Sequence, residues 1–126
     1  MQNAAVFFVT GGNEAYRRSV HESFRADGHQ VVLEATNFEE ALGVINGGQL
    51  QEKKVNVAMI EDYLPQNGRA DDILVGRDVS EKIRNQTPSV KILRLGFFPA
   101  SIYSYGDVYL GAMTTTEDIL QVIASL

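Results

Sequence analysis

Apolar residues gather in five short runs along the chain, and the segments between them repeat apolar residues every three or four positions. Continuous runs rich in β-branched and aromatic residues are typical of strands that are buried on both faces of a parallel sheet. The helical period of the intervening segments is typical of amphipathic helices. We therefore expect five strands, at residues 4–10, 31–34, 55–60, 90–95 and 108–110.

Capping and helix-breaking residues predict where the helices begin and end. Asn13 or a neighbour caps a first helix that extends to Ala26 and is followed by Gly28. A second helix, at residues 38–45, follows Asn37, with Glu40 as its capping-box partner. A third helix includes residues 78–84, and the last begins at residues 116–118.

The regular alternation of strands and helices predicts the fold class. Short connections between successive elements favour parallel strands that are joined by right-handed crossovers. We expect one domain over residues 1–126 with an α/β fold. Its form is a flavodoxin-like three-layer sandwich whose five-stranded parallel sheet has the order 2-1-3-4-5.

Composition and charge narrow the possible partners. The chain has 126 residues, of which 44% are hydrophobic and 21% are charged, so it can bury a core. A net charge of −5 argues against nucleic acid or an anionic membrane as the main partner. The absence of cysteine excludes disulfides, and two histidines leave little scope for zinc. No apolar run has the length of a signal peptide or a membrane span, so we expect a cytoplasmic location.

Two glycines, Gly11 and Gly12, follow the first strand, where the carboxyl ends of the strands form the site crevice of this architecture. Glycines at such a turn can hold a phosphate. The dinucleotide pattern needs a third glycine, however, and a Walker loop needs Gly-Lys-Ser/Thr, and neither occurs here. Binding of a nucleotide or another small molecule at the turn from Thr10 to Asn13 remains an alternative.

Four stretches resemble the receiver domain of bacterial response regulators. GHQVVLEATNFEEALGVI, residues 28–45, is similar to the second strand and second helix of that family. VNVAMIEDYLP, residues 55–65, is similar to its third strand and phosphorylation loop. PSVKILRLG (88–96) and GDVYLGAM (106–113) are similar to its fourth and fifth strands. The resemblance covers nearly all of the chain and implies the receiver fold.

All five active-site positions of the family nevertheless carry other residues. The family has two metal-binding acids, a phospho-acceptor aspartate, a threonine or serine, and a lysine. The resemblance places these at Gly11, Gly12, Glu61, Gly96 and Ala112. Without the acid pair a hard cation loses most of its oxygen ligands, so we expect neither magnesium nor another cofactor. The switch aromatic of the family is kept, at Tyr109.

Glu61 and Asp62 are the two acids at the former acceptor position. Phosphoryl transfer needs cations that offset the charge of the phosphoryl oxygens, so ordinary phosphorylation at Glu61 is not expected. Adjacent residues of a strand point to opposite faces, and we expect Asp62 to be a solvated loop acid. We expect Glu61 to be a leftover acid, with permanent mimicry of a charged state as the alternative. An atypical receiver that is phosphorylated at Asp62 or Glu61 is the competing hypothesis.

Two segments depart further from the family. Residues 66–75 form an insertion that we expect to be a solvated loop, in which Arg69 could pair with Glu61 or Asp62. The connection between the fourth and fifth strands is short, so the fourth helix is expected to be short, irregular or missing. The side chains of this connection either cover the sheet or form a surface for a protein contact. They include Phe97, Phe98, Ile102, Tyr103 and Tyr105.

Together these features predict a degenerate receiver, or pseudo-receiver. Such a domain would be a non-enzymatic interaction module in bacterial signal transduction. The expected partner is a protein, namely a histidine kinase, an output domain or a second copy of the chain. The expected contact face comprises residues 97–105, Tyr109 and the last helix.

Overall fold

A computed structural model describes residues 1–66, 72–96, 102–111 and 114–126 of the chain. In chain order the elements are β1 (Ala5–Val9), α1 (Glu14–Ala26), β2 (Gln30–Ala35), α2 (Phe38–Asn46), α3 (Gln49–Glu52), β3 (Val57–Glu61), β4 (Tyr63–Pro65), β5 (Asp72–Leu74), α4 (Gly76–Gln86), β6 (Lys91–Gly96), β7 (Val108–Gly111) and α5 (Thr116–Ser125). No helix in these ranges is long and apolar enough to cross a membrane.

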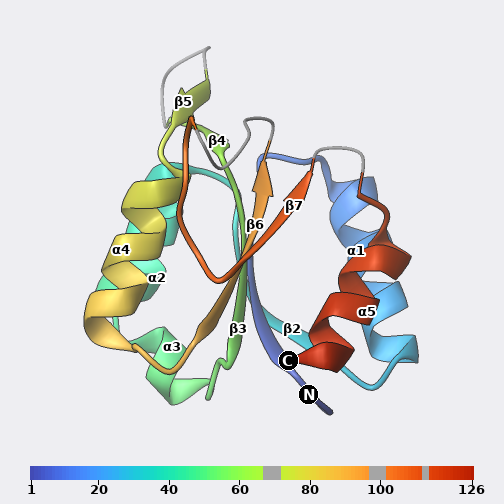
Figure 1. Cartoon of the computed structure of the whole chain (residues 1–126). Coiled ribbons are helices and arrows are strands. Elements are labelled where there is room, and N and C mark those ends of the chain that lie inside the picture. Colours follow the sequence, from blue (N-terminus) through green and yellow to red (C-terminus); the bar gives the residue numbers. More distant parts are fainter. Residues whose placement is uncertain (67–71, 97–101, 112–113) are drawn as a thin grey trace.

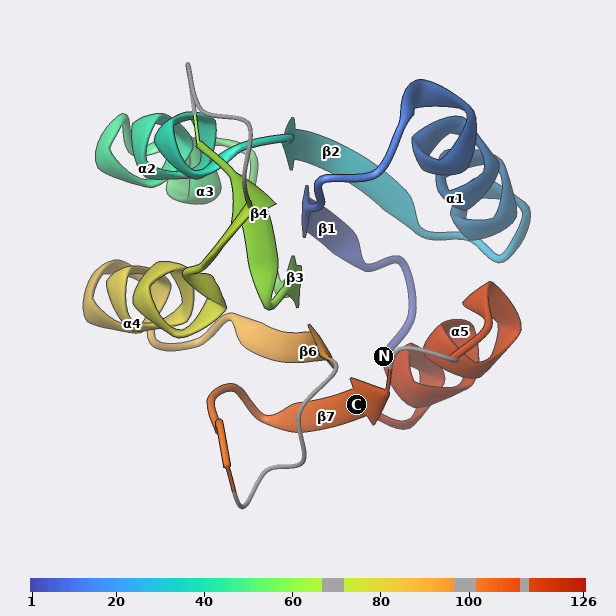
Figure 2. The ribbon, with the colours of Figure 1, turned by 90° about the horizontal axis from the view of Figure 1, so that it is seen from above.

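The main sheet has five strands in the order β2-β1-β3-β6-β7, and all of its strand pairs are parallel. Helices α2, α3 and α4 cover one face, and α1 and α5 cover the other (Figures 1 and 2). When only the strands of this sheet are counted, the order is 2-1-3-4-5. The predicted three-layer α/β architecture is therefore confirmed.

Each central strand supplies side chains to two separate apolar layers. In β1, Phe7 and Val9 join the cluster that includes residues of α2 and α4, whereas Val6 and Phe8 join the cluster that includes residues of α1 and α5. The alternation follows from the period of two in a strand. Neighbouring residues at the end of a strand therefore lie on opposite sides of the sheet.

Most of the predicted helix ends are confirmed. The side chain of Asn13 caps α1 and that of Asn37 caps α2. Gly28, which follows α1, has a φ of +87°, a conformation that favours glycine. The capping box at Glu40 is wrong in detail, because its carboxylate accepts hydrogen bonds from Thr36 rather than from the cap residue.

The insertion after β3 differs from its prediction. Tyr63–Pro65 and Asp72–Leu74 pair as an antiparallel hairpin, β4 and β5, so residues 66–75 are not simply a loop. Arg69 lies outside the described residues. In the connection between β6 and β7, residues 102–107 contain turns and bends but no helix, as expected for a short or missing fourth helix. The short helix α3 was not anticipated by the sequence pattern.

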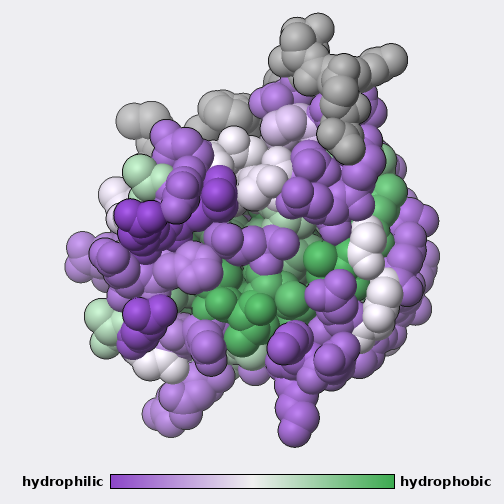
Figure 3. All heavy atoms as spheres, turned by 180° about the vertical axis from the view of Figure 1, so that it is seen from behind, coloured by the Kyte–Doolittle hydropathy of each residue, from purple (hydrophilic) through white to green (hydrophobic). Residues whose placement is uncertain are grey.

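The two edges of the main sheet, β2 and β7, have different surroundings. Figure 3 shows the molecule from behind, on the side of β2, and reveals an apolar area in the middle of this face with polar side chains around it. Val32 and Leu33 of β2 are only partly buried. On the opposite edge, β7 follows residues 102–107, which cross the front of the molecule in Figure 1.

Candidate functional site

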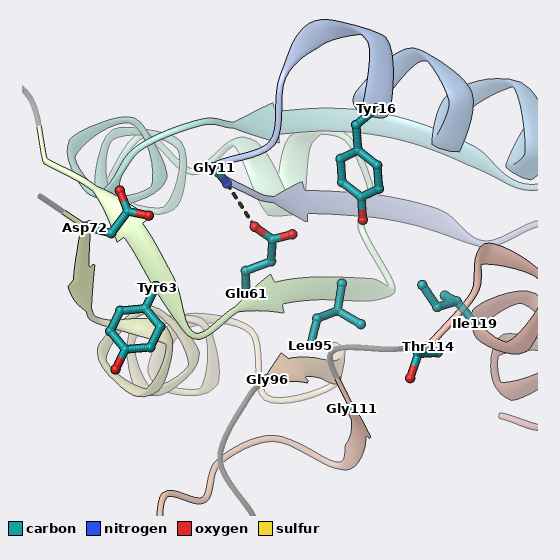
Figure 4. A pocket seen from close by; sticks show the side chains of 10 residues that line it. All are labelled: Gly11, Tyr16, Glu61, Tyr63, Asp72, Leu95, Gly96, Gly111, Thr114 and Ile119. Carbon is teal, nitrogen blue, oxygen red and sulfur yellow. Dashed lines mark hydrogen bonds between the residues drawn. The ribbon is translucent and has the colours of Figure 1, made fainter. Parts of the chain in front are cut away.

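The carboxyl ends of the central strands meet around a hollow of about 270 Å³, at the place where the sequence predicts the crevice. Glu61 at the end of β3 and Tyr16 of α1 point toward one another across it (Figure 4). The hollow is lined by Gly11, Tyr16, Glu61, Tyr63, Asp72, Leu95, Gly96, Gly111, Thr114 and Ile119. The structure thus brings together three of the predicted site residues, Glu61, Gly11 and Gly96.

Glu61 is held in the hollow by the turn that follows β1. Its Oε1 accepts a hydrogen bond of 3.0 Å from the backbone N–H of Gly11. Burial raises the pKa of the Glu61 carboxyl, and the charge of Asp72 acts in the same direction, against hydrogen bonds from Thr10 and Gly11. None of the described lining residues is basic. Glu61 is therefore a partly buried acid, and none of the described residues places a cation beside it in the hollow.

The glycine turn is engaged in internal contacts. The Gly11 N–H donates to Glu61, and the Gly12 N–H donates to Oγ1 of Thr10 at 2.9 Å. A Cβ at Gly12 would come within 2.4 Å of the Tyr16 ring, so close packing requires glycine there. The amides of Gly11 and Gly12 are thus already paired, and neither is a free donor for a phosphate.

Asp62 is not the solvated acid that the sequence predicts. Asp62 is 1% exposed, and its carboxylate forms a bidentate ion pair with Arg94 of β6. Arg94 Nε lies 2.9 Å from Oδ1 and Nη2 lies 2.8 Å from Oδ2. The hydroxyl of Tyr105 also donates to Oδ1, at 2.8 Å. The prediction that the side chains of Glu61 and Asp62 point to opposite faces of the sheet is correct. Asp62 lies on the side of α4, and Glu61 lies on the side of α1.

Arg94 is the residue of the candidate site that the sequence pattern did not predict. It is 1% exposed, and its guanidinium carbon lies 5.2, 5.4 and 4.6 Å from the ring centroids of Tyr103, Tyr105 and Tyr109. Hydrogen bonding with Asp62 raises the pKa of Arg94, so the guanidinium keeps its charge. A signal was present in the sequence: period-two alternation places Arg94 on the same face as Ile92, inside a buried strand. A charge at such a position calls for a buried partner.

Gly96 and the aromatic segment are shaped by this ion pair. Gly96 is buried beside both partners and has no room for a side chain. Tyr103 is only 8% exposed and Tyr105 is partly buried, so the expectation that they belong to an exposed surface is wrong for Tyr103 and only partly right for Tyr105. Ile102, at 70%, and Tyr109, at 40%, are exposed. Phe97, Phe98 and Ala112 lie outside the described residues.

The residues at the former acid pair do not fit magnesium. Gly11 and Gly12 offer no carboxylate, Glu61 is hydrogen-bonded to the turn, and Asp62 is occupied by Arg94. In the ranges that the structure covers, no group of three or more His, Cys, Asp or Glu side chains could hold a metal ion. A hard cation would need more oxygen ligands than the described residues of this crevice present.

Solved structures with the same fold are response regulators. Over 99% of this chain, RcsB of Salmonella typhimurium superposes with a TM-score of 0.71 at 17% identity, and the chain spans 61% of that protein. The receiver domain of Erythrobacter litoralis PhyR superposes with a TM-score of 0.72 at 14% identity. The match covers 99% of this chain and 90% of that domain. A structure of two RcsB dimers bound to two parallel DNAs superposes with a TM-score of 0.67 at 15% identity. The match covers 98% of this chain and 63% of that protein.

Sequence comparisons add nothing to this likeness: no family model matches the chain, and no curated protein sequence does so either. At identities below one fifth, the structural likeness establishes the architecture and not the activity. On that basis, the chain has the fold of a response-regulator receiver domain.

Proposed function

We propose that this chain is a pseudo-receiver, a module of bacterial two-component signalling that acts in the cytoplasm through protein contacts and without aspartyl phosphorylation. The observation that carries this proposal is the closed ion pair between Asp62 and Arg94. Both carboxylate oxygens of Asp62 accept hydrogen bonds, and its side chain is fully buried. An acceptor must present an oxygen to the incoming phosphorus, and this carboxylate has none to present.

Glu61 supports the same conclusion for a different reason. Its carboxyl faces the hollow and could be approached, but the positions that would supply a metal carry Gly11 and Gly12. Among the described residues that line the hollow, the charged ones are Glu61 and Asp72, and both are negative when ionised. The surroundings of Glu61 oppose phosphoryl transfer rather than assist it.

Treatment with acetyl phosphate, or with beryllofluoride, in the presence of magnesium tests the proposal. We expect no mass increase in the intact protein and no shift of the amide resonances of residues 61–66. Glu61→Gln and Asp62→Asn variants would locate any adduct. A stable adduct on either acid would replace the proposed function with that of an atypical phosphorylated receiver.

The contact face that we propose is smaller than the one expected from the sequence. Ile102, Tyr109 and the outer side of α5 remain, since Tyr103 is buried. A second copy of the chain is the first partner to test, because RcsB, which shares the fold, forms dimers in a solved structure. Analytical ultracentrifugation of the wild-type chain over a wide concentration range would detect self-association. A strictly monomeric chain would leave a different protein as the partner.

A small-molecule function is the second candidate, and the hollow of about 270 Å³ is the observation that favours it. Its volume is near the lower end of ordinary ligand sites. The paired amides of Gly11 and Gly12 argue against a phosphate at the turn. A thermal-shift screen with nucleotides and flavins tests this candidate, since a ligand at a hundredfold excess over its Kd adds ~2.7 kcal/mol. The absence of any shift would eliminate these ligands.

A further inference from the structure

The segment 102–107, which precedes β7, is attached to the buried ion pair of Asp62 and Arg94 through several contacts. Nη1 of Arg94 donates to the backbone carbonyl of Tyr103, and the Tyr103 ring lies over the guanidinium. Tyr105 reaches the same centre from the other end, because its hydroxyl donates to Asp62. Arg94 is therefore one of the groups that hold this segment, together with Arg77, whose Nε donates to the Ser104 carbonyl at 3.1 Å.

Arg94 also connects the buried acid Asp62 with the exposed edge of the sheet. Its guanidinium carbon lies 4.6 Å from the centroid of the Tyr109 ring, and Tyr109 is 40% exposed. A stacked cation of this kind favours one position of the ring. One buried guanidinium thus contacts the acid that follows β3 and an aromatic residue of the outer face.

We propose that the Asp62–Arg94 pair is a latch, closed in the resting protein, that sets the position of residues 102–107 and of the Tyr109 ring. Asp62 orients the guanidinium through two hydrogen bonds, and Arg94 in turn holds the Tyr103 carbonyl and packs against Tyr109. The latch deepens the proposed function, because it gives an unphosphorylated module one fixed outer face. Its test requires no phosphoryl donor, so an adduct on Glu61 would overturn the proposed function and leave the latch standing.

Burial makes this ion pair different from the ion pair that Asp107 of the segment forms. Arg84 and Asp107 also form an ion pair, of 2.7 Å, but their side chains are 37% and 30% exposed. Water can replace either partner of an exposed pair at little cost, whereas separation of a buried pair leaves two unsolvated charges. Arg84 is therefore the matched control for Arg94.

Hydrogen exchange of the full chain tests the latch. We expect Arg94→Met to accelerate amide exchange in residues 102–111 at least tenfold, with far smaller changes in β1 and α1. Arg84→Met should leave exchange in the same residues within about threefold of wild type. The double variant Asp62→Asn/Arg94→Met should recover thermal stability, because no buried charge remains unpaired. It should not recover the protection of residues 102–111, because the Tyr103 carbonyl and the Tyr109 ring have lost Arg94.

Three results would overturn the latch. One is exchange in residues 102–111 that stays within twofold of wild type in Arg94→Met. Another is equal acceleration over the whole sheet, which would make the pair a general stabilising contact. The third is a double variant that regains protection as well as stability. If Arg94→Met does not fold, the exchange of residues 102–111 is compared between Asp62→Asn and wild type. Asp62→Asn weakens the hydrogen bonds that orient Arg94, and its amide oxygen still accepts from the Tyr105 hydroxyl.

Discussion

The carboxylate of Asp62 occupies the space that a side chain at Gly96 would need. A Cβ on Gly96 would lie 2.3 Å from Oδ2 of Asp62, and 2.8 Å from Nε of its partner Arg94. The glycine at the threonine position of the receiver family is therefore a steric requirement of the ion pair. Gly96 and the buried Arg94 therefore belong to one packing arrangement.

Substitution of Gly96 should accordingly depend on Asp62. We expect Gly96→Ala to lower the free energy of unfolding by ~2 kcal/mol, because overpacking of a buried site typically costs ~1–3 kcal/mol. In an Asp62→Ala background the same change should cost at least ~1 kcal/mol less, since contacting residues show coupling of that size. Urea unfolding of the four proteins of this cycle measures the coupling.

Gly43 in α2 is the matched control for this substitution. A Cβ there would meet nothing within 4 Å. Gly43→Ala should stabilise the chain by ~0.5–1 kcal/mol, the usual gain for alanine over glycine within a helix. Strict additivity of Gly96→Ala and Asp62→Ala would contradict the steric relationship.

Glu61 should make the protein less stable as the pH rises. Burial raises the pKa of its carboxyl in the folded chain, so the folded state binds more protons than the unfolded state between the two pKa values. Stability then falls as the pH increases through that interval. We expect Glu61→Gln, which keeps an oxygen for the Gly11 N–H, to raise Tm at about pH 7 and to have little effect at about pH 4. Calorimetry over this range checks the sign, and a variant that is less stable at neutral pH would contradict it.

The sheet order and most helix ends could be predicted because they depend on local signals. The apolar runs at β1 and β3 and the capping residues Asn13 and Asn37 act over a few residues, and the structure uses them as expected. The hairpin of β4 and β5 could not be predicted in this way. Its strands have only three residues each, and one ends in Pro65, so no alternation marks them.

The chemistry of the site depended on contacts that are distant in sequence. The direction of Asp62 followed from strand alternation, but its solvation was predicted wrongly because Arg94 lies 32 positions away. The period of two in a strand places the charged Arg94 on a buried face of β6. This conflict between a buried position and a charged side chain was the signal in the sequence. The Tyr105 hydroxyl reaches Asp62 across 43 positions, and no spacing rule predicts such a contact.

Tyr105 should stay protonated at alkaline pH while the chain is folded. Burial and the hydrogen bond to Asp62 raise its pKa well above the usual range. We expect Tyr105→Phe to leave the tyrosinate absorbance of the native protein unchanged near pH ~10–11. The variant should lose ~1 kcal/mol of stability, the usual contribution of one buried hydrogen bond. A native titration that loses one tyrosine in the variant would show that Tyr105 ionises, contrary to this expectation.

Ile102 should contribute to association but not to folding. Its side chain is 70% exposed, so Ile102→Glu should change the free energy of unfolding by less than ~0.5 kcal/mol. If the outer face joins two copies of the chain, the same change should raise the dimer dissociation constant by at least tenfold, because a charge would be buried in an apolar contact. Gln51→Glu, an exposed change in α3 that adds the same charge outside the proposed contact face, serves as a control for a general effect of surface charge. Sedimentation velocity compares the three proteins, and an unaltered dissociation constant in Ile102→Glu would exclude this face from the dimer.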